Sequence, residues 1–186
     1  MFDSWMRLLQ QVPGSVLWLL SGSAFAKDNL RREAAHRGVD PDRLVFAFRL
    51  DYPDHLARMK LADLFLDTLP FNAGTTASDA LWAGVPVLTC VGRAFASRMA
   101  GSLLRAVGLP ELITENLADY EALAIKLATN PELLADIKSR LAKNRLTHAL
   151  FDTDRFRRHL EAAYITMWER QQRGEPPVSF SVTPIA

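Results

Sequence analysis

The chain of 186 residues is 49% hydrophobic and 23% charged, a composition that fits one folded domain with a sizeable buried core. Its formal charge at pH 7 is +1, so there is no reason to expect a binding surface for nucleic acid or for an anionic membrane. The apolar run from Val16 to Leu20 is too short to span a bilayer. The single cysteine, Cys90, excludes an intramolecular disulfide, and we expect cytoplasmic residence.

Short apolar runs alternate with longer amphipathic segments along the chain, which is the pattern of a parallel sheet covered by helices. The apolar runs predict strands buried on both faces. In chain order we expect a helix at 2–12, a strand at 15–20, a helix at 26–37, a strand at 43–48, a helix at 53–62, a strand at 64–67, a helix at 75–83, a strand at 85–90, a helix at 95–107, a strand at 111–114, and helices at 117–129, 131–146 and 153–173. This order predicts an α/β fold with a doubly wound, mainly parallel, Rossmann-like sheet. The domain would comprise residues 1–174, with 175–186 as an extended tail.

The clearest candidate site follows the third predicted strand, where a loop of small residues leads into a helix. In doubly wound folds ligands bind beyond the carboxyl ends of the strands, where the loop 68–74 is expected to lie. A helix start has unpaired N–H groups and a partial positive charge that attract phosphate. Ala73 and Gly74 let a ligand approach the backbone, and the hydroxyls of Thr75 and Thr76 can donate hydrogen bonds to phosphate oxygens. The alternative is that Thr75 only caps the helix.

Two charged residues lie beside this expected phosphate seat. Asp79 is one helical turn after Thr75, and its carboxylate could accept hydrogen bonds from the hydroxyls of a ribose; alternatively it satisfies the first turn of the helix. Arg49 ends the second predicted strand on the expected ligand edge. The alternative for Arg49 is an exposed ion pair with Asp51 or Asp54, which would contribute little energy.

The last predicted helix has a large apolar face. Phe156, Leu160, Tyr164, Met167 and Trp168 follow one another at near-helical spacing. One interpretation is that this face lies on the sheet of its own domain. If it does not, the face should drive self-association.

Several separate motifs, in the same order, resemble the C-terminal donor-binding half of the O-linked N-acetylglucosamine transferase family, the tetratricopeptide-associated glycosyltransferases that include the SPINDLY-type plant enzymes. The likeness extends over nearly the whole chain, from about residue 3 to 180. The residues that carry it are Val12 to Leu20, Leu66 to Thr68, Asn72, Thr75, Thr76, Asp79, Leu81 to Gly84, Pro86, Ala96 to Arg98 and Tyr164 to Glu169.

The resemblance implies one half of a GT-B glycosyltransferase that inverts configuration, needs no metal cofactor and moves N-acetylglucosamine from UDP to serine or threonine of a protein acceptor. In that family two Rossmann-like domains face each other, and the C-terminal one holds the nucleotide. The partners implied are therefore the nucleotide sugar UDP-GlcNAc and a protein acceptor.

The resemblance also implies roles for particular residues. Thr75 and Thr76 would bind the diphosphate while negative charge develops on it, so that fixed donors favour the transition state. His55 matches the family histidine beside the nucleotide, although a lone histidine on a helix is more often a solvated residue. Arg58 falls at a basic position one helical turn further along. The alternative interpretation is that Arg58 belongs to the solvent-exposed face of that helix. The complete expected nucleotide-binding set is Arg49, His55, Arg58, Asn72, Ala73, Gly74, Thr75, Thr76 and Asp79, with no metal ligand.

The chain departs from the family pattern at three places. Gly74 stands where many relatives have a histidine before the threonine pair, and the loop from Leu50 to Pro53 lacks a lysine that those relatives place before their nucleotide histidine. The segment that precedes Phe2 in the family, the acceptor-side domain and the tetratricopeptide repeats are also absent. Without a facing domain there is no proton acceptor for the nucleophile, so we expect no sugar transfer by this chain alone. The chain would then be a fragment, a truncated gene product, or one half of an enzyme whose other half is a separate partner chain.

Two other interpretations of the phosphate seat stay open. GDP-fucose is a rival donor, because a phosphate seat does not distinguish the base or the sugar. The domain could also be a nucleotide-binding or docking module without chemistry of its own, because this architecture hosts many functions.

Overall fold

The structure is a computed structural model that describes residues 1–184. The helices are α1 (Phe2–Gln11), α2 (Ala24–His36), α3 (Tyr52–Met59), α4 (Thr75–Ala83), α5 (Met99–Ala106), α6 (Leu117–Thr129), α7 (Pro131–Thr147) and α8 (Thr153–Gln172), and the strands are β1 (Leu17–Leu20), β2 (Leu44–Ala47), β3 (Phe65–Leu66), β4 (Val87–Cys90) and β5 (Ile113–Thr114). Each expected strand and helix is therefore present. The helix expected at 95–107 is divided, because a short 3-10 turn at Phe95–Ser97 precedes α5.

All of the strand pairs are parallel, as the alternation of strands and helices predicts. The strands form two hydrogen-bonded groups, β1 with β2 and β3 with β4 and β5. In the first group Leu17 is opposite Leu44, and in the second Leu66 is opposite Leu88. The strands expected from the sequence are thus present among the described residues, in two groups rather than in one continuous ladder.

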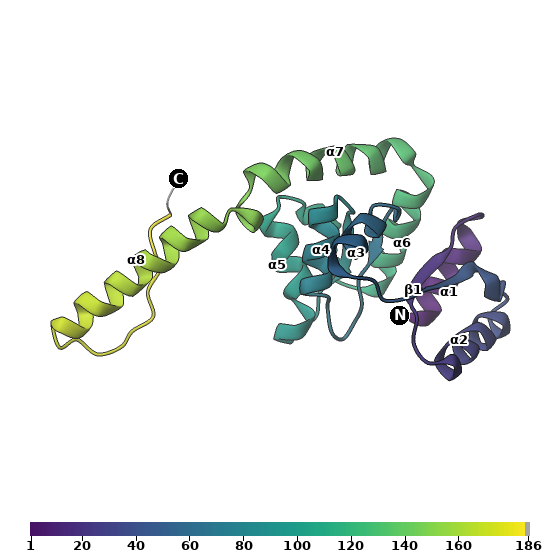
Figure 1. Cartoon of the computed structure of the whole chain (residues 1–186), viewed down its shortest axis with the longest axis horizontal. Helices are drawn as coiled ribbons and strands as arrows, with labels where there is room; N and C mark the ends of the chain where they lie inside the picture. The colour runs from purple at the N-terminus through teal and green to yellow at the C-terminus, as the bar shows by residue number, and fades with distance from the viewer. Residues whose placement is uncertain (185–186) are drawn as a thin grey trace.

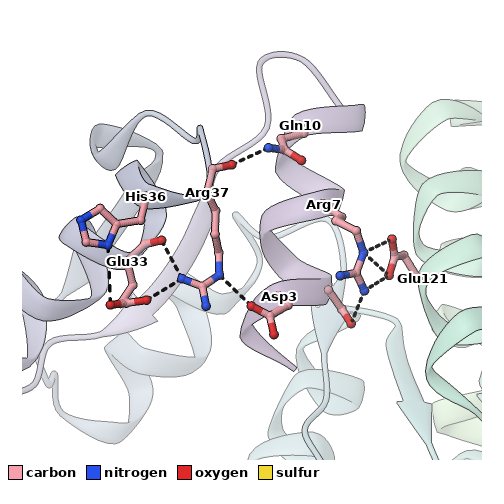
Figure 2. A network of polar contacts seen from close by, with 8 residues as sticks. Asp3, Arg7, Gln10, Glu33, His36, Arg37 and Glu121 are labelled. Atoms are coloured by element: carbon pink, nitrogen blue, oxygen red, sulfur yellow. Dashed lines mark hydrogen bonds and ion pairs between the residues drawn. The ribbon is translucent and has the colours of Figure 1, made fainter.

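Helix α1 packs between these two groups of strands. Met6 and Leu9 lie in a core with β1, α2 and β2, whereas Leu8 lies in a core with β4 and α6. Polar contacts of α1 point both ways as well (Figure 2): Arg7 pairs with Glu121 of α6 at 2.7 Å, and Asp3 pairs with Arg37, just after α2, at 2.7 Å. Helix α1 therefore connects the two groups that the sheet hydrogen bonds do not join.

The main core lies between β4 and the helices around it. Many of its buried side chains come from α4, α5, α6 and α7 as well as from the strand, among them Ala77, Ala80, Leu81, Val87, Ala100, Leu104, Leu127, Ile137 and Leu141. All four residues of β4 are buried, as expected of a central parallel strand covered on both faces. This core fixes the position of α4, whose N-terminus forms part of the candidate site.

Helix α8 leaves the body of the molecule, at the end opposite α1 and α2 (Figure 1). None of its residues is buried, and Phe156 and Trp168 are 65% and 66% exposed. The interpretation that its apolar face lies on the sheet of its own domain is therefore wrong. The following residues up to 184 form no regular structure and run back alongside α8 (Figure 1); residues 185 and 186 of the expected tail lie outside the described residues. Within the described part of the chain, no helix combines the length and apolarity needed to cross a bilayer.

Candidate functional site

A groove of about 420 Å³ opens where β3 ends and α4 begins. It lies at the carboxyl end of a parallel strand, the edge at which ligands of doubly wound folds bind. Five residues of the expected set line it, together with residues of β3 and of the loop. The lining consists of Phe65, Leu66, Asp67, Thr68, Phe71, Asn72, Ala73, Gly74, Thr75 and Thr76.

Helix α4 begins in this groove without a side-chain cap. Gly74 is the N-cap residue. Among the described residues, no side chain caps the helix by accepting a hydrogen bond from an N–H group of its first turn. The alternative that Thr75 only caps the helix is therefore wrong. Thr75 and Thr76 are both exposed, so their hydroxyls and the first-turn N–H groups are available to an anion.

Buried polar groups anchor the loop before α4 by hydrogen bonds. The side chain of Asn72 is 1% exposed, and its amide donates to the carbonyls of Thr68 at 2.8 Å and Cys90 at 3.3 Å. The Asp67 carboxylate accepts hydrogen bonds from the backbone N–H of Ala73 at 2.7 Å and from the Thr89 hydroxyl at 2.6 Å. Asn72 thus supports the loop, and its donor group is already used within the protein.

Asp79 lies on the side of α4 that faces α3. It is 8% exposed and accepts a hydrogen bond of 2.7 Å from the hydroxyl of Tyr52, the first residue of α3. This bond raises the pKa of Tyr52, because the carboxylate favours the protonated phenol. Asp79 is not among the residues that line the groove, but it is one turn away from Thr75 on the same helix.

His55 and Arg58, two residues of the expected nucleotide-binding set, lie together on α3. Arg58 donates to the carbonyl of Phe48 at 2.7 Å and lies 5.3 Å from the ring of Trp18, and its guanidinium is 3.5 Å from Nδ1 of His55. Arg58 is half-buried, so the interpretation that it belongs to a wet helix face is wrong. Its present contacts attach α3 to Trp18 in β1 and to the residue just after β2.

Arg49 is exposed just beyond β2. Among residues 1–184 it forms no ion pair with Asp51 or Asp54, so the guanidinium is free at the carboxyl edge of the strand. The groove lining includes none of Arg49, His55 and Arg58. The structure therefore brings the loop and the threonine pair together, and leaves these three cationic or imidazole groups on neighbouring elements.

Sequence reasoning missed Asp67 and Tyr52 as residues of this site. Asp67 had a signal, because a carboxylate directly after a buried strand lies at the ligand edge of a parallel sheet. Burial raises the pKa of Asp67, and the hydrogen bonds from Thr89 and Ala73 oppose this effect. Tyr52 had no signal, because its partner is 27 positions away. Within residues 1–184, no group of three or more His, Cys, Asp or Glu is arranged to hold a metal ion.

Comparison with known proteins decides the family. The family model described as "Glycosyl transferase family 41" matches residues 1–160. The chain belongs to glycosyl transferase family 41. This finding confirms the resemblance stated from the motifs, and with it that the chain comes from a glycosyltransferase family.

Curated relatives from this family are longer than the chain. A probable UDP-N-acetylglucosamine–peptide N-acetylglucosaminyltransferase SEC of Arabidopsis thaliana is 40% identical over 181 residues, which are 97% of this chain and 18% of the relative. A UDP-N-acetylglucosamine–peptide N-acetylglucosaminyltransferase of Caenorhabditis elegans is 36% identical over 94% of this chain and 15% of its own length. A probable enzyme of this name, SPINDLY of Petunia hybrida, is 34% identical, with 19% of its length covered. The chain thus spans less than a fifth of these relatives.

A solved structure of an O-GlcNAc transferase mutant from Thermobaculum terrenum has the same fold. It matches 90% of this chain and 33% of its own, with a TM-score of 0.83 and 34% sequence identity. The parallel α/β architecture of family 41 is therefore that of this chain, which corresponds to part of such an enzyme.

Proposed function

We propose that this chain is the donor-binding part of an O-GlcNAc transferase-like glycosyltransferase, and that the groove at the start of α4 receives the diphosphate of UDP-GlcNAc. The observation that carries this proposal is the uncapped start of α4 in a groove of about 420 Å³. The exposed hydroxyls of Thr75 and Thr76 add two donors at the same place. The names of the family 41 relatives support UDP-N-acetylglucosamine as the donor.

The chemistry required of such a seat is the stabilisation of a leaving group. When the bond from the sugar to UDP breaks, negative charge grows on the diphosphate. Backbone N–H groups and hydroxyls that are already in position favour that charged state, because they need no reorganisation during the reaction. Thr75, Thr76 and the first turn of α4 would perform this role, with Asp79 holding the ribose.

Transfer to a protein would need more than this chain. We propose that the acceptor and the residue that removes its proton belong to the remainder of the enzyme, in the same polypeptide or in a partner chain. The match to only 15–19% of the relatives' length supports this division. A water-poor cleft between two facing halves would then protect the reaction.

Calorimetric titration with UDP tests the proposed seat, with GDP as the comparison for the base. The parent chain is expected to bind UDP. Thr76→Val, which has the same shape without the hydroxyl, is expected to bind it about 10-fold more weakly, the scale for losing a hydrogen bond to a charged group. Thr129→Val is the matched control, because the hydroxyl of Thr129 bonds within α6 to Ile125, away from the groove.

Two outcomes would contradict the proposal. If UDP at millimolar concentration does not bind the parent chain, the start of α4 is not a nucleotide seat. If UDP binds equally to Thr76→Val, Thr129→Val and the parent, the nucleotide binds elsewhere. Equal affinity for UDP and GDP would retain the phosphate seat but remove the preference for uracil.

A further inference from the structure

The least expected group beside the groove is the carboxylate of Asp67. Asp67 is 1% exposed. Burial raises its pKa, the hydrogen bonds from Thr89, Ala73 and Thr68 oppose this effect, and no cation among the described residues contributes. Burying a carboxylate without a cation is unfavourable unless hydrogen bonds satisfy it. A buried anion is also electrostatically unfavourable beside a binding site for an anion, so the carboxylate needs compensating hydrogen bonds there.

The two oxygens of this carboxylate bind groups from different elements. Oδ1 accepts the backbone N–H of Ala73, two residues before α4 begins, at 2.7 Å. Oδ2 accepts the hydroxyl of Thr89 in β4 at 2.6 Å. One side chain at the end of β3 therefore connects the central strand to the loop directly before the threonine pair.

The remainder of the loop has anchors that depend on the same core. The backbone N–H of Asn72 donates to the carbonyl of Ala96 at 2.8 Å, and the amide of Asn72 reaches Thr68 and Cys90. Among residues 1–184 no comparable anchor follows Ala73 before the helix, because Gly74 is the N-cap and has no side-chain partner. The hydrogen bond from Ala73 to Asp67 is thus the last fixed point before the N–H groups that the diphosphate would meet.

We propose that Asp67 is the positioning residue of the diphosphate seat. By accepting one hydrogen bond from the Ala73 N–H and one from the Thr89 hydroxyl, it fixes the direction in which α4 starts. This inference rests on the proposed function, because it assigns a role within the same seat. Asp67 acts through the loop backbone and donates nothing to the nucleotide. In the parent both partners are donors, and the two acceptor oxygens of the carboxylate satisfy both of them.

The test compares variants of the full chain by UDP titration, at a temperature well below each melting temperature. Asp67→Ala removes both acceptors and is expected to weaken UDP binding at least 10-fold. Asp67→Asn keeps an acceptor for Ala73, and the Thr89 hydroxyl can rotate to accept from the new amide. The Asp67→Asn variant is therefore expected to retain UDP affinity within about threefold of the parent.

Tyr120→Phe is the matched control for a role in stability alone. The Tyr120 hydroxyl donates to the main-chain carbonyl of Asp67 at 3.0 Å, so its removal weakens the same end of β3 without touching the carboxylate. It is expected to lower the melting temperature and to leave UDP affinity within about twofold. If Asp67→Ala does not fold, Thr89→Val takes its place, because it removes the donor to Oδ2 and is expected to weaken UDP binding more than Tyr120→Phe does.

The inference is overturned if Asp67→Ala binds UDP as tightly as the parent, if Tyr120→Phe loses as much affinity as the Asp67 or Thr89 variant, or if Asp67→Asn is no better than Asp67→Ala. Each of these outcomes requires that the parent chain bind UDP. Absence of UDP binding by the parent is a different result, since it rejects the proposed function itself and the role of Asp67 with it.

Discussion

At the scale of single residues, the Asp79 carboxylate has a defined partner. It accepts a hydrogen bond from Tyr52 at 2.7 Å and has further acceptor capacity for the hydroxyls of a ribose. We predict that Asp79→Ala weakens UDP binding by about 1–3 kcal/mol, the scale for losing a charged hydrogen-bond partner, with the fold intact. Calorimetry would measure this loss, and circular dichroism would check the fold.

Tyr52→Phe provides the matched comparison for this prediction. It keeps the ring and removes only the donor to Asp79, so a smaller loss of UDP affinity is expected. An Asp79→Ala variant that binds UDP as the parent does would remove Asp79 from the site.

The buried carboxylate of Asp67 predicts a dependence of stability on pH. Burial raises the pKa of Asp67 above its ordinary value of 3.8. Between the unfolded and the folded pKa, the folded chain retains a proton that the unfolded chain has released, so this group's contribution to the free energy of unfolding falls as pH rises through that window. The Asp67→Asn variant has no such ionisation. Its stability relative to the parent should therefore increase as pH rises from about 4 to about 7.

Urea unfolding of both proteins across this pH range measures the difference directly. The exposed carboxylates that are paired with arginine, such as Asp3 and Glu33, titrate in both proteins and cancel in the comparison. A difference that stays constant with pH would show that Asp67 does not change ionisation between the folded and unfolded states in this range.

At the scale of elements, two glycines have the same backbone conformation but different surroundings. Comparing an alanine at each position therefore separates the effect of backbone strain from that of side-chain packing. Gly14 has φ of 76° and Gly108 has φ of 74°, both in the left-handed region that side chains disfavour. A Cβ at Gly14 would meet nothing within 4 Å, whereas at Gly108 it would lie 2.6 Å from the ring of His148. Gly108, two residues after the end of α5, therefore also marks a close approach to the segment after α7.

We predict that Gly14→Ala lowers the free energy of unfolding by about 1 kcal/mol, from backbone strain alone. Gly108→Ala is expected to lower it by about 2–4 kcal/mol, because the contact with His148 adds to the same strain. Thermal or urea unfolding measures both. Equal losses of unfolding free energy in the two variants would mean that the His148 ring moves aside without an energetic penalty.

At the scale of the whole molecule, α8 presents an apolar surface that the other residues within 1–184 do not cover. Phe156, Tyr164 and Trp168 recur on one helical face and are 65%, 58% and 66% exposed. Such a surface favours association in water. We predict that the chain self-associates through α8.

Analytical ultracentrifugation tests this prediction. The double substitution Phe156→Glu with Trp168→Glu is expected to yield monomers. Leu61→Glu is the control, because Leu61 is 79% exposed but lies just after α3, so that the added charge falls away from α8. A monomeric parent chain, or equal association by all three proteins, would contradict the role of α8.

Helix α1 also matters at the scale of the whole molecule. It joins the two groups of strands through packing and through surface ion pairs (Figure 2). The pair of Arg7 with Glu121 and the pair of Asp3 with Arg37 are partly or largely exposed, so salt screens them. The apolar contacts of Met6, Leu8 and Leu9 are buried. The connection therefore depends mainly on hydrophobic burial, and the ion pairs add orientation.

The sequence by itself determined the order of strands and helices, the parallel fold class and the start of α4 at Thr75. These features follow from local signals, since hydrophobic periodicity and the small residues before Thr75 lie within a few positions of the element they define. The tertiary structure decided the rest. The Asp67 carboxylate finds Thr89 across 22 positions and Tyr52 finds Asp79 across 27, and α8 extends away from the sheet. Contacts of this kind depend on how buried surfaces pack in three dimensions, which no local pattern of residues specifies.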